Sequence, residues 1–226
     1  RRRKTKGGRS IGMANSGAGT KNERYCGKRY ETFSRFISYY NQIDTVRELE
    51  PENILEVGIG SGFLKNYLRS RGYAVTTADH DKLLGPDIVC DITHTPLKEN
   101  SFDLVMAFEI LEHLPYEDSL KGIKEMERIS RRYVVLSVPR SCVYLGFSFM
   151  FGLPILHKFV SLGLRIPFFW IGPEYGSKEH FWELGRRGFP VRRLVKDIER
   201  LGLTVKQKKG HVALNTQHYF LVLEKT

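Results

Sequence analysis

The segment that most constrains the fold is an apolar run that contains an acidic residue and opens into three alternating glycines. Residues 54–62 read Ile54-Leu55-Glu56-Val57-Gly58-Ile59-Gly60-Ser61-Gly62, and amphipathic sequence follows directly over residues 63–68. This order predicts a buried strand, a tight turn and a helix, the first unit of an open α/β sheet whose ligand lies beyond the carboxyl end of the strand. Glycines let the backbone approach that ligand closely, because they carry no Cβ.

The glycine spacing separates the ligands that such a turn can hold. A dinucleotide fingerprint, G-x-G-x-x-G, requires its third glycine where this chain has Phe63, and here the glycine comes one residue early, at Gly62. The Gly-Lys-Ser/Thr of a phosphate-binding loop does not occur in the sequence. Glu56 would repel a phosphate but suits a ligand that carries an ammonium or sulfonium group.

The positive charge of the chain is concentrated at its start. The formal net charge is +11, and six Lys and Arg residues lie within residues 1–9. Such a tail could contact nucleic acid or an anionic membrane. The simpler interpretation is that residues 1–24 are a disordered basic leader or tag, because they are rich in glycine and serine and Met13 could be a natural start. Residues 25–226 are then expected to form one domain.

Cysteine usage and hydropathy predict a cytoplasmic protein. Cys26, Cys90 and Cys142 are odd in number and widely spaced, which favours neither a disulfide framework nor a thiolate zinc site. The longest apolar region, 143–171, is interrupted by charged residues and prolines and is therefore a poor transmembrane span.

Strand and helix patterns alternate along the rest of the chain. Strands are expected at about residues 53–57, 73–78, 87–90, 102–108, 133–138, 203–206 and 219–223. Helices are expected at about residues 25–50, 63–71, 117–130 and 190–201. In the first helix, large apolar residues recur every three or four positions and are expected to pack on the sheet. They are Tyr30, Phe33, Phe36, Ile37, Tyr40, Ile43 and Val46.

An acidic residue ends the second expected strand. Asp79 follows residues 73–78, and the interval from Gly60 to Asp79 is close to the usual spacing of about 20 residues for an acidic ribose ligand. A carboxylate at this position can accept hydrogen bonds from both ribose hydroxyls. The alternative is an aspartate that only caps a turn; the upstream glycines favour the ribose role.

Three motifs follow one another in a specific order. They are E-x-G-x-G-x-G at 56–62, F-D-L-V-x-x-x-E-I-L-E-H-L at 102–114 and Y-V-V-L-S-V-P at 133–139. Together they resemble the class I S-adenosylmethionine-dependent methyltransferases, in particular a broad bacterial and archaeal group of small-molecule, lipid and sugar modifiers. This resemblance, over about residues 50–140, implies an α/β fold with a doubly wound, Rossmann-like sheet of seven strands that is mostly parallel, with an antiparallel last strand.

The resemblance also implies a set of residues that bind S-adenosylmethionine. They are Glu56, Gly58, Gly60, Gly62 and Asp79, then Asp91 and Ile92 as the pair that contacts adenine, with Phe108 beside the methyl end. In such proteins one or two aromatic residues of the leading segment also close over the cofactor. A second interpretation of Asp91 stays open, because an aspartate before Thr93-His94-Thr95-Pro96 can simply begin a turn.

Two histidines are the candidate catalytic residues. Methyl transfer from a sulfonium needs an aligned acceptor, and a neutral amine or hydroxyl acceptor must also lose a proton. His113, which follows the fourth strand, and His180, in a His-x-Trp-Glu segment, could each take that proton. Either histidine could instead hold a loop or pack against it.

The segment that ends at His113 allows a metal-dependent alternative. Some members of the superfamily, including small-RNA 2′-O-methyltransferases and quinone O-methyltransferases, hold a divalent metal with E-x-x-E-H. That resemblance would assign Glu109, Glu112 and His113, provided that the turn between them is helical. Many relatives carry the same letters without a metal, so S-adenosylmethionine without a metal is the favoured expectation.

Residues 143–180 are expected to form an apolar insertion. The segment is rich in Phe, Leu, Gly and Pro and comes where this fold commonly inserts a substrate lid. It could line an apolar acceptor pocket, or make peripheral membrane contact through residues 143–171. A helical hairpin that covers the sheet is the alternative.

The sequence therefore favours a methyltransferase that uses S-adenosylmethionine and modifies an oxygen or nitrogen atom of a small-molecule or lipid-like acceptor. An RNA methyltransferase is the second hypothesis, although half of the basic excess lies in the leader and the insertion is apolar. A cofactor-binding or membrane-interaction module without catalysis is the third. The glycine spacing disfavours a nicotinamide-dependent oxidoreductase.

Overall fold

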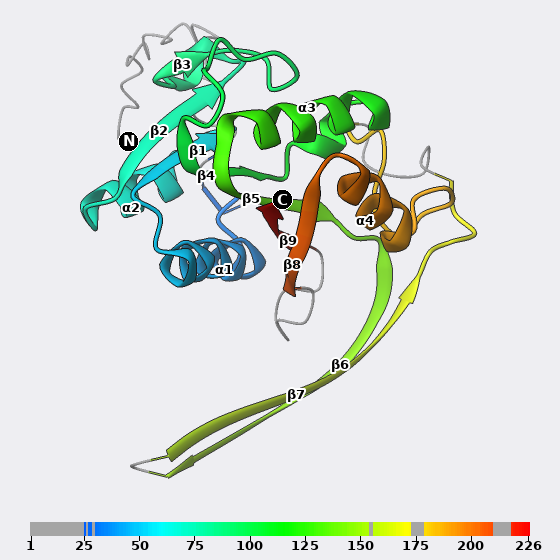
Figure 1. Cartoon of the computed structure of the whole chain (residues 1–226). Helices are drawn as coiled ribbons and strands as arrows, with labels where there is room; N and C mark the ends of the chain where they lie inside the picture. The colour runs from blue at the N-terminus through cyan, green and yellow to red at the C-terminus, as the bar shows by residue number, and fades with distance from the viewer. Residues whose placement is uncertain (1–24, 26, 29, 154–155, 173–178, 210–217) are drawn as a thin grey trace, which may run out of the picture.

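The order of strands and helices follows the predicted alternation. A computed structural model of the chain describes residues 25, 27–28, 30–153, 156–172, 179–209 and 218–226 (Figure 1). The predicted leader, 1–24, lies outside the described residues. Among the residues that are described, no helix is long and apolar enough to cross a membrane.

Within the described part of the chain, seven strands form one sheet in the order β3-β2-β1-β4-β5-β9-β8. The strands are β1 Asn53–Val57, β2 Ala74–Asp79, β3 Ile88–Val89, β4 Phe102–Phe108, β5 Ser130–Pro139, β8 Leu203–Lys209 and β9 His218–Lys225. The first five are parallel, whereas β9 is antiparallel to both of its neighbours. The predicted Rossmann-like sheet with an antiparallel last strand is confirmed.

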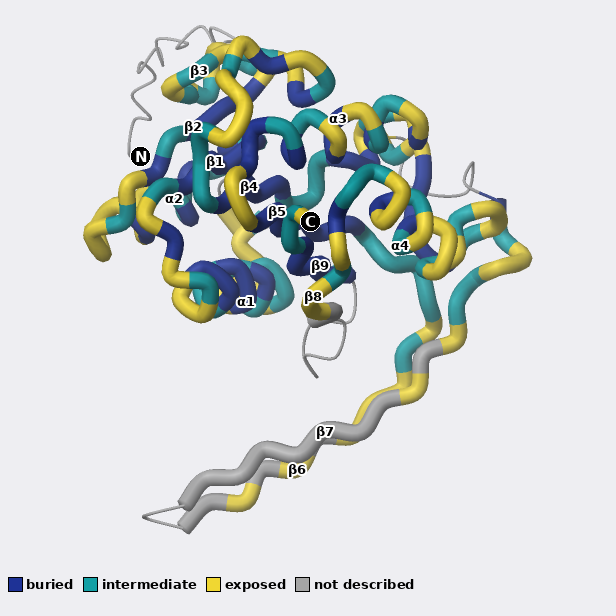
Figure 2. Tube along the Cα trace, in the orientation of Figure 1, coloured by how far each residue is buried: buried dark blue, intermediate teal, exposed yellow. Residues whose placement is uncertain are grey.

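Helices cover both faces of this sheet. They are α1 Phe33–Leu49, α2 Phe63–Ser70, α3 Tyr116–Ile129 and α4 Val191–Arg200, with short 3-10 turns η2 Lys82–Leu84 and η3 Leu111–His113. Ile54 and Met106 pack with α1 and α2, whereas Leu55 and Val105 pack with α3 and α4. Alternate strand residues thus supply two apolar cores, and buried segments follow the central strands in Figure 2.

The register of the parallel strands aligns four strand ends. Val57 pairs with Ala78 of β2 and with Ala107 of β4, and Ala107 pairs with Leu136 of β5. The residues that follow these four lie toward the same edge of the sheet, where its parallel strands have their carboxyl ends. They are Gly58, Asp79, Phe108 and Ser137.

The leading helix is shorter than predicted. α1 begins at Phe33, because the side chain of Thr32 caps its first turn and accepts a hydrogen bond from the backbone N–H of Arg35 (3.3 Å). The described residues between 25 and 32 form turns, so the helix predicted from residue 25 starts late.

Only part of the predicted apolar face of α1 packs on the sheet: Val46 is buried in the core, and Ile43 packs against that core. Phe33, Phe36 and Tyr40 are exposed and do not pack on the sheet. The buried residues of α1 are Ser38, Asn41, Gln42, Thr45 and Val46. Two of these polar side chains are satisfied within the helix: the Gln42 amide donates to the Ser38 hydroxyl, and the Thr45 hydroxyl donates to the Asn41 carbonyl.

Residues 142–153 and 156–167 form a pair of antiparallel strands, here called the β6–β7 hairpin, and not the helical hairpin considered above. β6 (Cys142–Leu153) and β7 (Leu156–Pro167) pair antiparallel in a sheet of their own and extend away from the body of the molecule (Figure 1). Leu145, Phe147 and Phe149 alternate with smaller residues at the two-residue period of a strand, which explains why no helix forms here. The hairpin pairs only with itself and does not pack over the seven-stranded sheet (Figure 1).

Trp182 anchors the segment that follows the hairpin. Its indole N–H is buried and donates to the Ser119 hydroxyl (2.9 Å) and the Leu111 carbonyl (3.2 Å). The backbone N–H of Phe181 donates to the Glu112 carbonyl (2.8 Å). These bonds hold the segment against η3 and the first turns of α3.

Replacing Trp182 tests this anchor. Trp182→Phe keeps most of the apolar contact and removes the N–H, so the free energy of unfolding should fall by about 1–2 kcal/mol. Trp182→Ala should cost about 3–5 kcal/mol because it leaves a cavity. Urea unfolding followed by circular dichroism measures both losses; two variants as stable as the unmodified protein would contradict the anchoring role.

Candidate active site

A cavity of about 1040 Å³ lies at the carboxyl ends of β1, β2 and β4. Its wall includes all but one of the predicted cofactor residues, Gly62 being the exception. These residues are Glu56, Gly58, Gly60, Asp79, Asp91, Ile92 and Phe108. His113 and His180, the predicted catalytic residues, line the same cavity.

The glycine turn uses backbone conformations that other residues rarely adopt. The φ angles of Gly58, Gly60 and Gly62 are +79°, +48° and +72°. A Cβ on Gly58 would lie 2.0 Å from Cδ1 of Ile110, so this position also lacks space for a side chain. Gly62 is the N-cap of α2, which explains its place outside the cavity wall.

Aromatic residues from before β1 border this turn. The hydroxyls of Tyr39 and Ser61 are 3.0 Å apart, and the Tyr39 ring stacks on Phe63 with centroids 4.3 Å apart. A Cβ on Gly60 would lie 3.4 Å from the Tyr30 hydroxyl. Closure of these rings over a bound cofactor remains a prediction.

Asp79 ties the end of β2 to the glycine turn. One carboxylate oxygen accepts from the backbone N–H of Ile59 (3.0 Å), and the other accepts from the N–H of Asp81 (2.9 Å). The turn-capping role is therefore present. Oδ1 also lies 3.2 Å from Nδ1 of His80, whereas Oδ2 has a further lone pair, so a predicted contact with a ribose hydroxyl is compatible with this geometry.

Glu56 is a buried carboxyl group at the floor of the cavity. It is 4% exposed, and its Oε2 has no hydrogen-bond partner among the described residues. Burial raises its pKa to about 8, and the nearby charges of Lys65 and Arg69 only partly oppose this. A cationic ligand beside Glu56 would favour the ionised form.

Asp91 begins a turn, which is the second of the two roles that the sequence left open for it. Its Oδ1 accepts from the backbone N–H (2.7 Å) and the hydroxyl (2.8 Å) of Thr93, and these bonds lower the pKa of Asp91. The adenine role of Asp91 and Ile92 remains a prediction, which rests on their place in the cavity wall.

Two acidic residues occupy the end of the cavity beyond β4. Glu109 accepts from the Ser137 hydroxyl (2.6 Å), and its other oxygen lies 3.4 Å from Nε2 of His218. Glu112 is 1% exposed, and its Oε2 has no partner among the described residues. Burial, reinforced by the neighbouring Glu109 carboxylate, raises the pKa of Glu112 well above its ordinary value.

His113 and His180 are neighbours although 66 residues lie between them in the sequence. Their ring centroids are 5.0 Å apart in an edge-to-face arrangement. Nδ1 of His113 lies 2.9 Å from the Glu179 carbonyl oxygen, and Nδ1 of His180 lies 2.8 Å from the Glu183 carboxylate. Both acceptors require a hydrogen on Nδ1, so each neutral ring keeps its lone pair on Nε2.

Glu183 is held in its ionised form. Burial alone would raise its pKa, but hydrogen bonds from His180, Ser141 and Arg186 outweigh burial and lower the pKa to about 2. The carboxylate therefore remains an acceptor for the His180 Nδ1–H across the neutral pH range.

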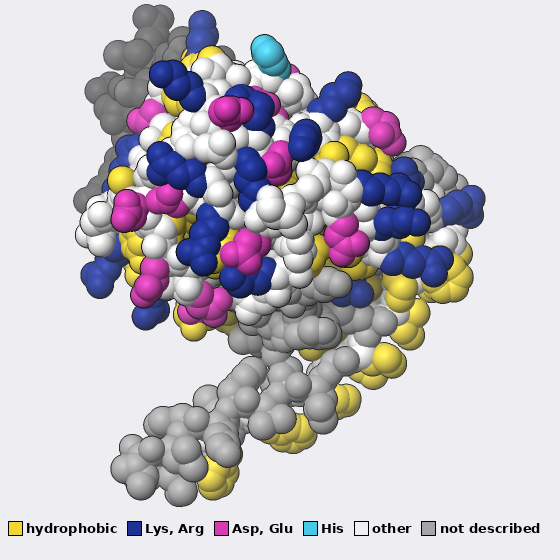
Figure 3. Space-filling model, viewed as in Figure 1, with side chains coloured by type: hydrophobic (Ala, Val, Ile, Leu, Met, Phe, Trp, Pro, Cys, Tyr) yellow, Lys and Arg dark blue, Asp and Glu magenta, His cyan; other side chains and the backbone are white. Residues whose placement is uncertain are grey.

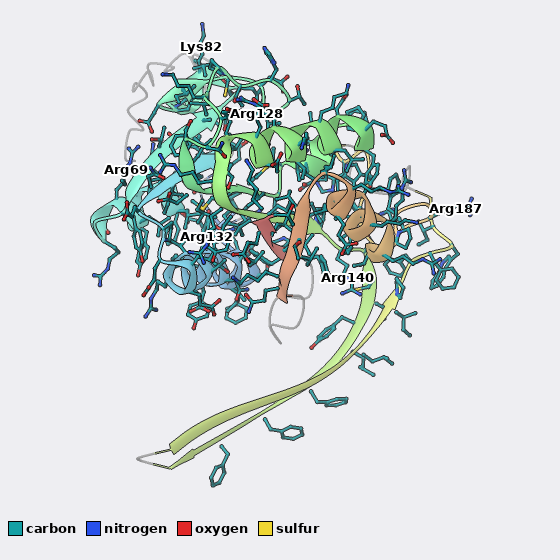
Figure 4. The ribbon with its side chains drawn as sticks, in the orientation of Figure 1. Arg69, Lys82, Arg128, Arg132, Arg140 and Arg187 are labelled. Atoms are coloured by element: carbon teal, nitrogen blue, oxygen red, sulfur yellow. The ribbon has the colours of Figure 1, made fainter. Side chains whose placement is uncertain are left out.

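Sequence reasoning missed several residues that support these groups. Glu183 could have been found from the sequence, because it lies three residues after His180. Ser137 and His218 could not, because they lie on β5 and β9 and share no motif with Glu109. Arg140, where β5 leads into β6, also lines the cavity, and its guanidinium lies 5.6 Å from the ring centre of Tyr219 (Figure 4).

Sequence comparison finds similarity to known proteins in the central part of the chain. Residues 55–136 match the family model described as a methyltransferase domain. An uncharacterised protein of Methanocaldococcus jannaschii, MJ0638, is 32% identical over 81 residues, which is 34% of this chain and 35% of that protein. The match therefore spans about a third of that curated relative.

Comparison with solved structures identifies the fold. The magnesium protoporphyrin IX methyltransferase of Synechocystis PCC 6803, with bound S-adenosylhomocysteine, has a TM-score of 0.63 at 14% identity over 93% of this chain and 95% of that one. An S-adenosylmethionine-dependent methyltransferase of Clostridium acetobutylicum has a TM-score of 0.54 at 13% identity, over 91% and 95%. The 1,6-didemethyltoxoflavin-N1-methyltransferase of Burkholderia thailandensis has 0.52 at 15%, over 85% and 86%.

The fold and the family match agree with the resemblance found in the sequence. The sheet is that of the class I S-adenosylmethionine-dependent methyltransferases, as the predicted resemblance implied. Within this fold, residues 55–136 match the family model of a methyltransferase domain.

Glu56 should give cofactor binding a pH dependence. Its pKa of about 8 keeps it mostly protonated at neutral pH, so a bound cation must displace a proton. Affinity for S-adenosylmethionine should therefore rise with pH and level off above the pKa of Glu56. Below that pKa the rise should be up to about tenfold per pH unit steeper in the unmodified protein than in Glu56→Gln. Calorimetry across pH measures this difference, and parallel profiles for the two proteins would contradict it.

Proposed function

We propose that this chain is an S-adenosylmethionine-dependent methyltransferase that modifies an oxygen or nitrogen atom of a small-molecule or lipid-like acceptor. The observation that carries the proposal is the convergence of the predicted cofactor residues, from four separate segments, on the wall of one cavity. Relatives of the same fold that act on magnesium protoporphyrin IX and on 1,6-didemethyltoxoflavin support a small-molecule acceptor.

The proposed cofactor pose follows the wall of the cavity. The ribose hydroxyls donate to Asp79, and the adenine lies beside Asp91 and Ile92. The positively charged part of the cofactor is drawn to Glu56, while Phe108 lies beside the methyl end. This pose leaves the end of the cavity near His113 for the acceptor.

The proposed reaction is an in-line displacement. A lone pair of the acceptor atom forms the new bond to the methyl carbon, and the sulfonium sulfur takes the electron pair of the bond that breaks. A neutral acceptor also loses its proton. We assign activation of the acceptor to His113 and His180, because both line the cavity and their Nδ1 contacts leave the Nε2 lone pairs unused.

Substitutions in the cofactor half test the proposed function. Asp79→Asn and Gly60→Arg should each weaken S-adenosylmethionine binding by at least about tenfold, because one loses a charged acceptor and the other fills the turn. Asp118→Asn, on the surface of α3, is the matched control and should bind normally. Isothermal titration calorimetry gives all three affinities; unchanged binding in both site variants would refute the assignment.

A membrane is the partner that the β6–β7 hairpin suits best. Phe147, Phe149 and Phe151 alternate along β6 and are 61%, 64% and 61% exposed, and Leu164 on the paired strand is 60% exposed. These side chains form one apolar face. Because an isolated hairpin has unpaired edges, it would lie in the membrane interface and not cross the bilayer. Basic side chains over α4, beside the hydrophobic base of the hairpin in Figure 3, suit anionic lipids.

An RNA acceptor has weaker support. The basic side chains of α4 line a separate cavity of about 740 Å³ that contains Arg192, Arg193, Lys196 and Arg200. Asp197 pairs with two of them, at 3.7 Å from Arg193 and 3.0 Å from Arg200. The remaining positive charge would suit RNA or an anionic membrane equally, but the adjoining β6–β7 hairpin is apolar, which favours the membrane.

Liposome flotation tests the proposed membrane contact. The double variant Phe147→Asp, Phe149→Asp should lower binding to vesicles of phosphatidylcholine and phosphatidylserine by at least about tenfold, because it places two charges on the apolar face. The control variant Phe33→Asp, Phe36→Asp changes exposed phenylalanines of α1 and should bind as the unmodified protein does. Equal flotation of the hairpin variant and this control would contradict the contact.

A further inference from the structure

Arg140 is a half-buried cationic side chain in the cavity wall. Among the described residues, no carboxylate forms an ion pair with it, and its Nε is buried without a hydrogen-bond partner. We propose that the terminal nitrogens of Arg140 bind an anionic group, a carboxylate or a phosphate, of an amphiphilic methyl acceptor. This inference rests on the proposed function and specifies the class of its acceptor.

Two carboxylates of the same cavity wall are engaged by other residues. Glu183 accepts from the guanidinium of Arg186 (2.8 Å), and Glu109 accepts from the Ser137 hydroxyl (2.6 Å). Neither forms an ion pair with Arg140. Partial burial of a guanidinium without a counter-ion is unfavourable, so an anion that enters the cavity would offset that cost.

The backbone on both sides of Arg140 is held in place. The N–H of Leu184 donates to the Pro139 carbonyl (3.1 Å), and the N–H of Ser141 donates to the Leu184 carbonyl (2.8 Å). The guanidinium lies 5.6 Å from the ring centre of Tyr219, a contact that uses none of its N–H donors. The planar fork of an arginine matches the two oxygens of a carboxylate or phosphate, and a fixed position limits the entropic cost of binding.

Negative charge in the cofactor half of the cavity orients an anionic acceptor. Asp79, Asp81 and Asp91 line that half, and their carboxylates would repel an anion placed beside them. The charged group of the acceptor is therefore expected at Arg140 and not over the proposed cofactor pose.

An apolar strip begins next to Arg140 and could hold the rest of the acceptor. Figure 4 shows Arg140 where β5 passes into the β6–β7 hairpin. At the base of this hairpin, Val143 pairs with Ile166 and Leu145 pairs with Leu164, and all four side chains are exposed. Directly paired and alternate residues share one face of a two-stranded sheet. A hydrocarbon tail along this strip would bury apolar surface while its charged end binds Arg140.

Calorimetric titration of the full protein with octyl phosphate tests the inference. The protein is saturated with S-adenosylhomocysteine, and the probe is kept below its micelle-forming concentration. Arg140→Gln should weaken binding by at least about tenfold, because it removes the charged donors. Arg140→Lys should lie between the two, since lysine keeps the charge but not the fork.

Arg132→Gln is the matched control. Arg132 is also an arginine of β5 with its guanidinium over a tyrosine ring, that of Tyr133 at 4.6 Å, but it lies outside the cavity wall and pairs with Glu224 (3.5 Å). This variant loses the same charge and should bind octyl phosphate as the unmodified protein does.

Two further probes separate the parts of the acceptor. Octanol has the tail without the charge, and inorganic phosphate has the charge without the tail, so each should bind the unmodified protein at least about tenfold more weakly than octyl phosphate. Octanol that binds as tightly as octyl phosphate would contradict the role of Arg140. Inorganic phosphate that binds as tightly would assign the site to a free anion and overturn the amphiphilic acceptor.

The remaining outcomes separate this inference from the proposed function. No octyl phosphate binding by the unmodified protein, or equal binding by Arg140→Gln and Arg132→Gln, would overturn the inference. If circular dichroism shows that Arg140→Gln fails to fold, undiminished binding by Arg140→Lys would overturn it instead. Normal binding of S-adenosylhomocysteine with no effect of Arg140 would remove only this inference. Arg140-dependent binding by a protein that binds no S-adenosylhomocysteine would leave an anion site and remove the proposed function.

Discussion

The register between β1, β2, β4 and β5 is the constraint on which the rest of the molecule depends. Because Val57, Ala78, Ala107 and Leu136 stand side by side, the glycine turn and Asp79 emerge from the same edge of the sheet. A slip of one residue in any pair would move an entire strand face from one core to the other. The bond from the Ile59 N–H to Asp79 then fixes the turn to its neighbouring strand (3.0 Å).

The cofactor half of the cavity could be predicted because its signals are local. Glycines that need positive φ, an acidic residue at a strand end and a helix directly after the turn each leave a short pattern in the sequence. Their order also determines the topology, since parallel strands joined by helices place all carboxyl ends at one edge. The same patterns show that Asp91 could begin a turn, and it does.

The acceptor half depends on contacts that no local pattern contains. His113 and His180 meet because Trp182 packs beneath η3, and a single sequence gives no sign of that contact. Periodicity predicted the packing of Ile43 and Val46 in α1, but the other buried residues of that helix are polar and are satisfied partly by their own hydrogen bonds. The β6–β7 hairpin was not predicted because aromatic-rich sequence suits both strands and buried helices. An alternation of large and small residues distinguishes a strand from a helix only when the pairing partner is known.

The central claim is that the cavity beside the glycine turn binds S-adenosylmethionine. A crystal structure of the protein with S-adenosylhomocysteine tests it most directly. We predict the nucleoside in this cavity, with its ribose hydroxyls within hydrogen-bond distance of the Asp79 carboxylate and its sulfur toward the end that contains His113 and His180. A nucleoside bound at another place, or a cavity that stays empty when the ligand saturates the crystal, would contradict the account.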